Sequence, residues 1–209
     1  MKTVYLVRHG ETDGNLKQYS QLPSTELSPK GHEGATALAD RIANLEVDLL
    51  VASPYTRAQQ TAEYVSKKVN LPVTTVESFH ENMRPEAVRG KTYNEGTQDI
   101  YKQYNEDVWL KEKTLIGMEN FHDVLERMKQ SLTFLESQPQ NDIVVVSHGD
   151  FLRFFISHIL LGQSDNLIEN RKVYDSFVRL SNVAITVIEH NQEKWTVKMY
   201  NDHSHFADN

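Results

Sequence analysis

The chain has 209 residues, of which 39% are hydrophobic and 24% are charged, a composition typical of one globular domain that buries a full core. It contains no cysteine, which excludes disulfides, thiolate nucleophiles and thiolate metal sites, so its chemistry must use oxygen and nitrogen groups. A net charge of −7 at pH 7 argues against nucleic acid as the main partner, because duplex binding depends on clustered lysines and arginines.

The first half of the chain alternates between strand and helix patterns. Three short apolar runs predict strands, at residues 3–7, 47–52 and 72–76. Between them, Ser28-Pro29 and Ser53-Pro54 each combine an N-cap residue with a proline at the first helical position, and apolar residues at helical spacing follow. This β-α-β-α-β rhythm is typical of a parallel sheet.

The second half adds a long helix and further strands. Apolar residues spaced along 121–135 predict an amphipathic helix, and the run 142–146 predicts another buried strand. A helix is expected at about 151–161 and should end at Gly162, because glycine favours the position after a helix. Three C-terminal runs predict strands, at residues 177–181, 183–190 and 194–200, with a turn at 190–193.

We therefore predict an α/β fold, a three-layer α/β/α sandwich with a mostly parallel central sheet and an antiparallel edge. No repeat, low-complexity tract or linker divides the sequence, which favours a single domain over residues 1–209. The segment from about 82 to 117 fits the rhythm poorly and is rich in Tyr, Lys, Arg and Glu. We interpret it as a cap, or lid, inserted over one end of the sheet.

Charged side chains follow four of the predicted strands, at the edge where open parallel sheets bind ligands. They are Arg8 and His9 after the first strand, Arg57 after the second, Glu81 after the third, and His148 with Gly149 after the fourth, with Asn15 as a further amide donor. Two imidazoles, two guanidiniums and a carboxylate suit a tetrahedral dianion such as phosphate. A glycine after each histidine lets the backbone approach a ligand closely, which makes Gly149 a candidate phosphate contact.

These groups can support phosphoryl transfer through a histidine. Arg8 and Arg57 would bind the equatorial phosphate oxygens, and a protonated His148 would add a donor. An unprotonated nitrogen of His9 would attack phosphorus and form a phosphohistidine. Glu81 would protonate the leaving oxygen and then accept a proton from the attacking water, for which its pKa must be raised. The mechanism requires no metal and no other cofactor.

Four segments carry a resemblance to a known family. R-H-G-E-T-D-G-N (residues 8–15) resembles the R-H-G-E-T-x-x-N signature of the histidine phosphatase superfamily, which has the phosphoglycerate mutase-like fold. S-P-Y-T-R-A-Q-Q-T-A (53–62), S-H-G-D-F-L-R (147–153) and N-D-H-S-H-F (201–206) are similar to further segments of that family. The resemblance covers nearly the whole chain. Carried over by position, it implies His9 as nucleophile, Arg8, Arg57 and His148 as phosphate ligands, Glu81 as proton donor and Asn15 as a further binding residue.

The main prediction is a metal-independent phosphatase that acts on a small phosphorylated metabolite, with a cofactor-dependent mutase as the alternative. Mutases of this family carry an R-F-x-G-W-like stretch after the first motif and an N-E-R-H-Y-G-like stretch at the acid. The corresponding residues here, 17–27 and 80–90, keep neither the Gly-Trp nor the Arg-His-Tyr. A phosphate-binding regulatory module without turnover is a distant alternative. A metal-dependent hydrolase is disfavoured, because no H-E-x-x-H motif occurs.

The sequence also bears on cellular location, oligomeric state and further residues that could contact the substrate. No apolar run approaches the roughly 18 residues of a membrane span and the N-terminus lacks a signal peptide, so we expect a cytoplasmic protein with no membrane partner. The sequence leaves the oligomeric state open, a homodimer included. Arg84, Arg89 and Lys91 lie near enough to Glu81 in the sequence to reach the substrate.

Overall fold

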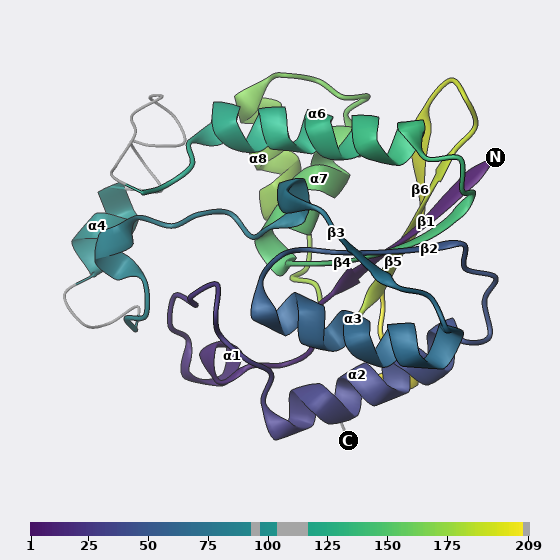
Figure 1. Ribbon diagram of the computed structural model, residues 1–209. Coiled ribbons are helices and arrows are strands. Elements are labelled where there is room, and N and C mark those ends of the chain that lie inside the picture. Colours follow the sequence, from purple (N-terminus) through teal and green to yellow (C-terminus); the bar gives the residue numbers. More distant parts are fainter. Residues whose placement is uncertain (93–96, 104–116, 207–209) are drawn as a thin grey trace.

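The computed structural model describes residues 1–92, 97–103 and 117–206, and its strands form a sheet with the order β3-β2-β4-β1-β5-β6 (Figure 1). These strands are β1 (Lys2–Arg8), β2 (Leu49–Ala52), β3 (Val73–Thr75), β4 (Asp142–Ser147), β5 (Ile185–His190) and β6 (Trp195–Asp202). The four strands β1, β2, β3 and β4 run parallel to one another, whereas β5 pairs antiparallel with both β1 and β6. The predicted mostly parallel sheet with an antiparallel edge is therefore confirmed.

Helices cover both faces of this sheet. Figure 1 shows α2 (Pro29–Ile42) and α3 (Thr56–Val69) on one face, and α6 (Phe121–Ser137), α7 (Gly149–Leu160) and α8 (Leu167–Ser176) on the other. β4 lies between two cores, because its side chains alternate. Ile143 and Val145 pack with residues of α6 and α7, whereas Val144 and Val146 pack with residues of α2 and α3. This confirms the three-layer α/β/α sandwich.

The first predicted helix start is confirmed and the second is displaced. Ser28 caps α2, since its Oγ accepts a hydrogen bond from the amide of Gly31 at 3.1 Å, and Pro29 occupies the first turn. The prediction of a helix from Ser53-Pro54 was wrong by two residues: α3 begins at Thr56, after Tyr55, which makes no side-chain cap. The hydroxyl of Ser53 instead contacts Nε2 of a buried histidine, described below.

α7 begins at Gly149, two residues before the predicted start at 151. The local sequence offers no side-chain cap there, because the capping group comes from elsewhere in the chain. The carboxylate of Glu81 accepts hydrogen bonds from the amides of Asp150 and Phe151 in the first turn. The predicted end is confirmed, because Gly162 has a φ of 62° just after the helix.

The segment between α7 and β5 differs from the prediction. Residues 177–181 are not a strand: Val178 is 72% exposed, and the carbonyl of Leu180 accepts from Arg8 rather than from a neighbouring strand. α8 was not predicted at all, because its apolar pattern is weak and its start depends on a single cap, Asn166, whose Oδ1 accepts from the amides of Ile168 and Glu169.

The predicted cap at about 82–117 is described only in part, since residues 93–96 and 104–116 lie outside the described residues. Its described part contains η2 (Glu86–Val88) and α4 (Gln98–Gln103) (Figure 1). Bridges from Tyr19 to Thr92 and from Ser20 to Arg89 connect it to the chain that follows α1 (Asp13–Lys17). Two further turns, η1 (Glu77–Phe79) and η4 (Ser204–Phe206), complete the described elements. Among the helices described, none has the length and apolar character to cross a membrane.

Candidate active site

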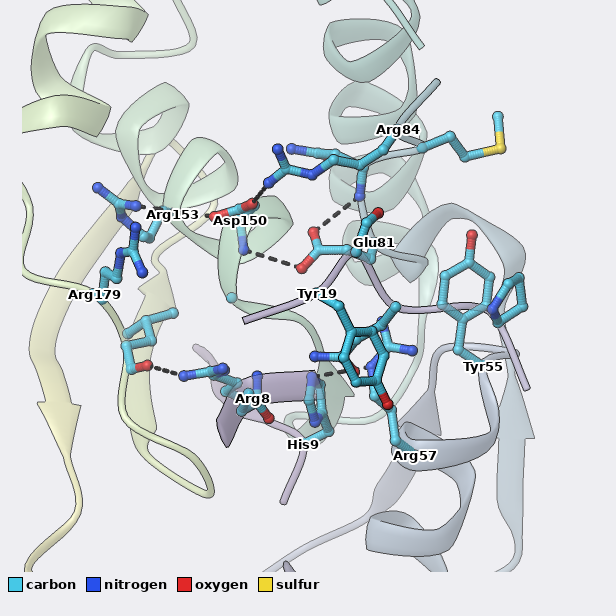
Figure 2. A pocket seen from close by; sticks show the side chains of 18 of the residues that line it. Arg8, His9, Tyr19, Tyr55, Arg57, Glu81, Arg84, Asp150, Arg153 and Arg179 are labelled. Carbon is cyan, nitrogen blue, oxygen red and sulfur yellow. Dashed lines mark hydrogen bonds and ion pairs between the residues drawn. The ribbon is translucent and has the colours of Figure 1, made fainter. Parts of the chain in front are cut away.

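A cavity of about 450 Å³ opens where the parallel strands end (Figure 2). Six of the seven predicted site residues line it: Arg8, His9, Asn15, Arg57, Glu81 and Gly149. The seventh, His148, lies behind this surface, in contact with the ring of His9. The sheet therefore brings together residues that are more than a hundred positions apart in the chain, at the edge predicted from the strand ends.

His9 is held in one tautomer. Its Nδ1 lies 2.6 Å from the carbonyl oxygen of Gly10 and must donate to it, because a carbonyl can only accept. Its Nε2 accepts a hydrogen bond from Nε of Arg57 at 3.1 Å. Burial, and then the charges of Arg57 and Arg8, hold the pKa of His9 well below its ordinary value. The ring is therefore neutral, and Nε2 carries the lone pair that a nucleophile needs.

Gly10 shows why a glycine follows His9. A Cβ at Gly10 would lie 2.6 Å from the carbonyl oxygen of Gly31, at the start of α2. The amide of Gly10 donates to Oγ1 of Thr61 at 3.0 Å, and Thr61 donates to the carbonyl of Arg57 at 2.7 Å. The end of β1 is thus fixed against both α2 and α3, which fixes the position of the His9 ring.

Arg8 and Arg57 place positive charge on either side of His9. Nη1 of Arg57 donates to the carbonyl of Leu22 at 3.0 Å, and burial lowers the pKa of Arg57 to about 10. Nη1 of Arg8 donates to the carbonyl of Leu180, whereas its buried Nε has no hydrogen-bond partner among the described residues. A buried donor without a partner is costly. A phosphate oxygen in the cavity would satisfy it.

His148 is fully buried, and its ring centroid lies 5.2 Å from that of His9. Its Nε2 contacts Oγ of Ser53 at 2.7 Å, and its Nδ1 has no hydrogen-bond partner in the described part of the chain. Burial, and then the charge of Arg57, hold the pKa of His148 well below its ordinary value, which argues against the protonated ring expected from the sequence. If Ser53 donates to Nε2, a neutral ring still carries a hydrogen on Nδ1 that can be donated.

Glu81 lies at the N-terminus of α7. Its Oε2 accepts from the amide of Asp150 at 3.2 Å, and its Oε1 accepts from the amides of Phe151 and Asn82 at 2.9 Å each. Burial, and then the negative charge of Asp150, raise the pKa of Glu81. The direction of this shift agrees with the sequence-based expectation and suits a group that donates a proton near neutral pH.

The two remaining predicted residues, Asn15 and Gly149, also line the cavity. Oδ1 of Asn15 accepts from the amide and hydroxyl of Thr12, at 3.1 and 3.0 Å, and from Nδ2 of Asn182 at 3.3 Å. Nδ2 is therefore the side-chain atom of Asn15 that remains able to donate to a ligand. A Cβ at Gly149 would lie 3.2 Å from Nε of Arg8, so the glycine leaves room for that guanidinium beside α7.

Several residues that line the cavity were not predicted, namely Tyr19, Tyr55, Asp150, Arg153, Tyr174 and Arg179. Asp150 and Arg153 lie three apart near the start of α7, so an earlier helix start would have indicated them. Tyr174 and Arg179 come from a missed helix and a wrongly predicted strand. Arg84 and Arg89 line the cavity as expected, whereas Lys91 does not. Within the described residues, no group of three or more histidine and carboxylate side chains is arranged to hold a metal ion.

Comparison with known proteins agrees with this geometry. Residues 4–203 match the family model described as histidine phosphatase superfamily (branch 1). The chain belongs to this superfamily. The resemblance noted in the sequence is thereby confirmed over almost its full length.

Within the superfamily, the chain is similar to proteins named as phosphatases and as mutases. The Bacillus subtilis "Uncharacterized phosphatase PhoE" is 28% identical, over 99% of this chain and 98% of that protein. The Erwinia tasmaniensis "Probable phosphoglycerate mutase GpmB" is 30% identical, over 100% of this chain and 96% of that protein. The structure of a phosphoserine phosphatase from Entamoeba histolytica in complex with 3-phosphoglyceric acid aligns with a TM-score of 0.80 at 26% identity, covering 99% of this chain and all of that one.

Proposed function

We propose that this protein is a metal-independent phosphatase that hydrolyses a small phosphomonoester through a phosphohistidine on His9. The observation that carries the proposal is the state of His9, whose unprotonated Nε2 lies at the cavity floor beside the guanidinium of Arg57. A buried imidazole that stays neutral while surrounded by positive charge is suited to attack an anionic phosphoryl group.

The reaction follows from these positions in two steps. First, Nε2 of His9 forms a bond to phosphorus while the bond to the leaving oxygen breaks, and Glu81 gives its proton to that oxygen. Arg8, through its unpartnered Nε, and Arg57 would hold the phosphoryl oxygens, with Nδ1 of His148 as a further donor. Second, water gives a proton to Glu81 and attacks phosphorus, the bond to Nε2 breaks, and phosphate leaves.

A mutase remains the second candidate, because the Erwinia tasmaniensis relative is named as a probable phosphoglycerate mutase. In a mutase, a substrate hydroxyl rather than water would take the phosphoryl group from His9. The cap at 82–117 is also part of this proposal, supported by the position of Arg84 and Arg89 on the cavity wall. Cytoplasmic location stays a prediction.

The test is hydrolysis of p-nitrophenyl phosphate in the presence of EDTA. We expect full activity with the chelator and a loss of at least about a thousandfold in His9→Ala. His122→Ala, which removes an exposed histidine on α6, is the matched control and should keep activity. Activity that requires added metal, or that survives in His9→Ala, would refute the phosphohistidine mechanism. Transfer of the group from phosphorylated His9 to monophosphoglycerate, without release of phosphate, would instead establish the mutase.

A further inference from the structure

The cavity holds more positive charge than one phosphate group needs. Its lining contains six arginines, against two acidic residues, Glu81 and Asp150. The chain as a whole has a net charge of −7, so this concentration of cations is local. A phosphate dianion bound by Arg8 and Arg57 would offset only the charge at the floor, and four arginines remain farther out: Arg84, Arg89, Arg153 and Arg179.

Two of the four outer arginines share one carboxylate. Nη2 of Arg84 lies 2.5 Å from Oδ2 of Asp150, and Nη1 of Arg153 lies 4.0 Å from Oδ1 of the same side chain. Nη2 of Arg153 also donates to the carbonyls of Tyr174 and Phe177, at 2.7 and 3.2 Å. These bonds fix the two guanidiniums in place, and a single carboxylate cannot neutralise both of them.

Arg179 differs from the other three. It is exposed, and it makes no hydrogen bond or ion pair among the residues described. Figure 2 shows it beside Arg153 on the cavity wall, and its charge acts unfavourably on half-buried Arg8. A cation that lines a cavity next to other cations, with no internal partner, gains a favourable ion pair when an anion binds there.

We propose, on the basis of the function proposed above, that the substrate carries a carboxylate in addition to its phosphate, and that Arg179 binds this carboxylate at the outer wall beside Arg153. A planar guanidinium with two parallel N–H donors matches a carboxylate, and an exposed, unpaired side chain can reorient to meet it. A cavity of about 450 Å³ accommodates a small metabolite with both groups. The ligand of the Entamoeba histolytica structure, 3-phosphoglyceric acid, has this chemistry.

The test uses substrates that differ only in the carboxylate. O-phosphoserine is compared with O-phosphoethanolamine, and 3-phosphoglycerate with glycerol 3-phosphate. We expect kcat/KM to be about tenfold to a hundredfold higher for the carboxylated member of at least one pair, the range for a hydrogen-bonded charged group. Arg179→Gln should remove most of this preference and leave O-phosphoethanolamine, glycerol 3-phosphate and p-nitrophenyl phosphate within about twofold of wild type.

Lys172→Gln is the matched control, because it removes one exposed positive charge on α8 outside the cavity lining. It should leave the preference unchanged. The inference is overturned if neither pair shows a preference, if Arg179→Gln slows both members of a pair equally, or if Lys172→Gln has the same effect as Arg179→Gln. Each of these results is compatible with hydrolysis of p-nitrophenyl phosphate by the wild type, and so leaves the proposed function intact. If the wild type hydrolyses no phosphomonoester, p-nitrophenyl phosphate included, both the proposed function and this inference are refuted.

Discussion

The floor of the cavity and its outer wall are held in place by different kinds of contact. At the floor, His9 and Arg57 are 2% exposed and bond to each other where β1 ends and α3 begins. At the wall, the side chains of Arg84 and Asp150 are 25% and 30% exposed, and Arg179 is more exposed still. The floor is therefore a product of the fold, whereas the wall depends on a few polar contacts between loops and α7. Glu81 joins the two regions, because its carboxylate caps α7 while its charge acts on Arg57.

The largest loss of activity is expected when the proton donor, Glu81, is replaced. Glu81→Gln should slow phosphorylation of His9 by an alkyl phosphate such as O-phosphoserine by about a hundredfold to ten-thousandfold, because the leaving alkoxide then receives no proton. The reaction with p-nitrophenyl phosphate should slow much less, since nitrophenolate leaves without a proton. Rapid-mixing measurement of the first turnover separates this step from hydrolysis of the intermediate. An equal loss with both substrates would contradict a proton-donating role for Glu81.

Replacing Arg127 tests the contacts that connect the outer wall of the cavity to the rest of the fold. Arg127 of α6 pairs with Glu119, with Nε to Oε1 at 2.6 Å, and its Nη1 donates to the carbonyls of Ser78 and His80 on the segment that leads to Glu81. Arg127→Met should lower the free energy of unfolding by about 3–5 kcal/mol, because it leaves Glu119 buried without its partner.

Urea denaturation measures this loss, and the double variant Glu119→Gln/Arg127→Met is the matched control. The double variant should recover part of the stability, because no buried charge is left unpaired. Both the single and the double variant should lose more activity on alkyl phosphates than on p-nitrophenyl phosphate, because Arg127 no longer tethers the segment that carries Glu81. A single variant as stable as wild type would show that this buried pair does not anchor the wall.

The contrast between floor and wall also explains how far the sequence could predict the site. Arg8, His9, Arg57 and His148 each follow a strand or begin a helix, so the order of elements alone brings them to one edge. Arg179 and Tyr174 have no such signal. Their positions depend on α8 and on the loop at 177–184, where exposed apolar residues such as Val178 produce a strand-like sequence pattern. The state of His148 was equally hidden, because the burial that lowers its pKa is a property of the packed molecule.

The buried histidines of the floor predict how stability depends on pH. Because the folded-state pKa values of His9 and His148 lie below their ordinary value, the unfolded chain binds more protons than the folded one below about pH 6.5. Stability should therefore fall as the pH falls, by up to about 1.4 kcal/mol per pH unit for each ring. Glu81 acts in the opposite direction, since its folded-state pKa is raised. Urea titrations at pH 7.5 and 5.5 should show a smaller pH dependence in His148→Gln than in wild type; an identical dependence would mean that His148 is not buried in its neutral form.

We expect the smallest effect from replacing Asp150, a residue of the outer wall that influences the pKa of Glu81. Asp150 is the second cause, after burial, that raises the pKa of Glu81, while Arg57 and the amides of Asn82 and Phe151 lower it. Asp150→Asn removes the repulsion and leaves the cation of Arg84 without its carboxylate, and both changes favour ionised Glu81.

The alkaline limb of the pH profile of kcat/KM for O-phosphoserine should therefore move to lower pH in Asp150→Asn, because the proton donor is lost earlier as the pH rises. Asp175→Asn removes an exposed carboxylate of α8 that does not line the cavity, and it should leave the limb unchanged. A purely structural role for Asp150 would lower activity at every pH without moving the limb. A limb that moves shows instead that the outer wall sets the proton affinity of the acid, so that one carboxylate both holds the arginines of the wall and extends the pH range over which the floor can work.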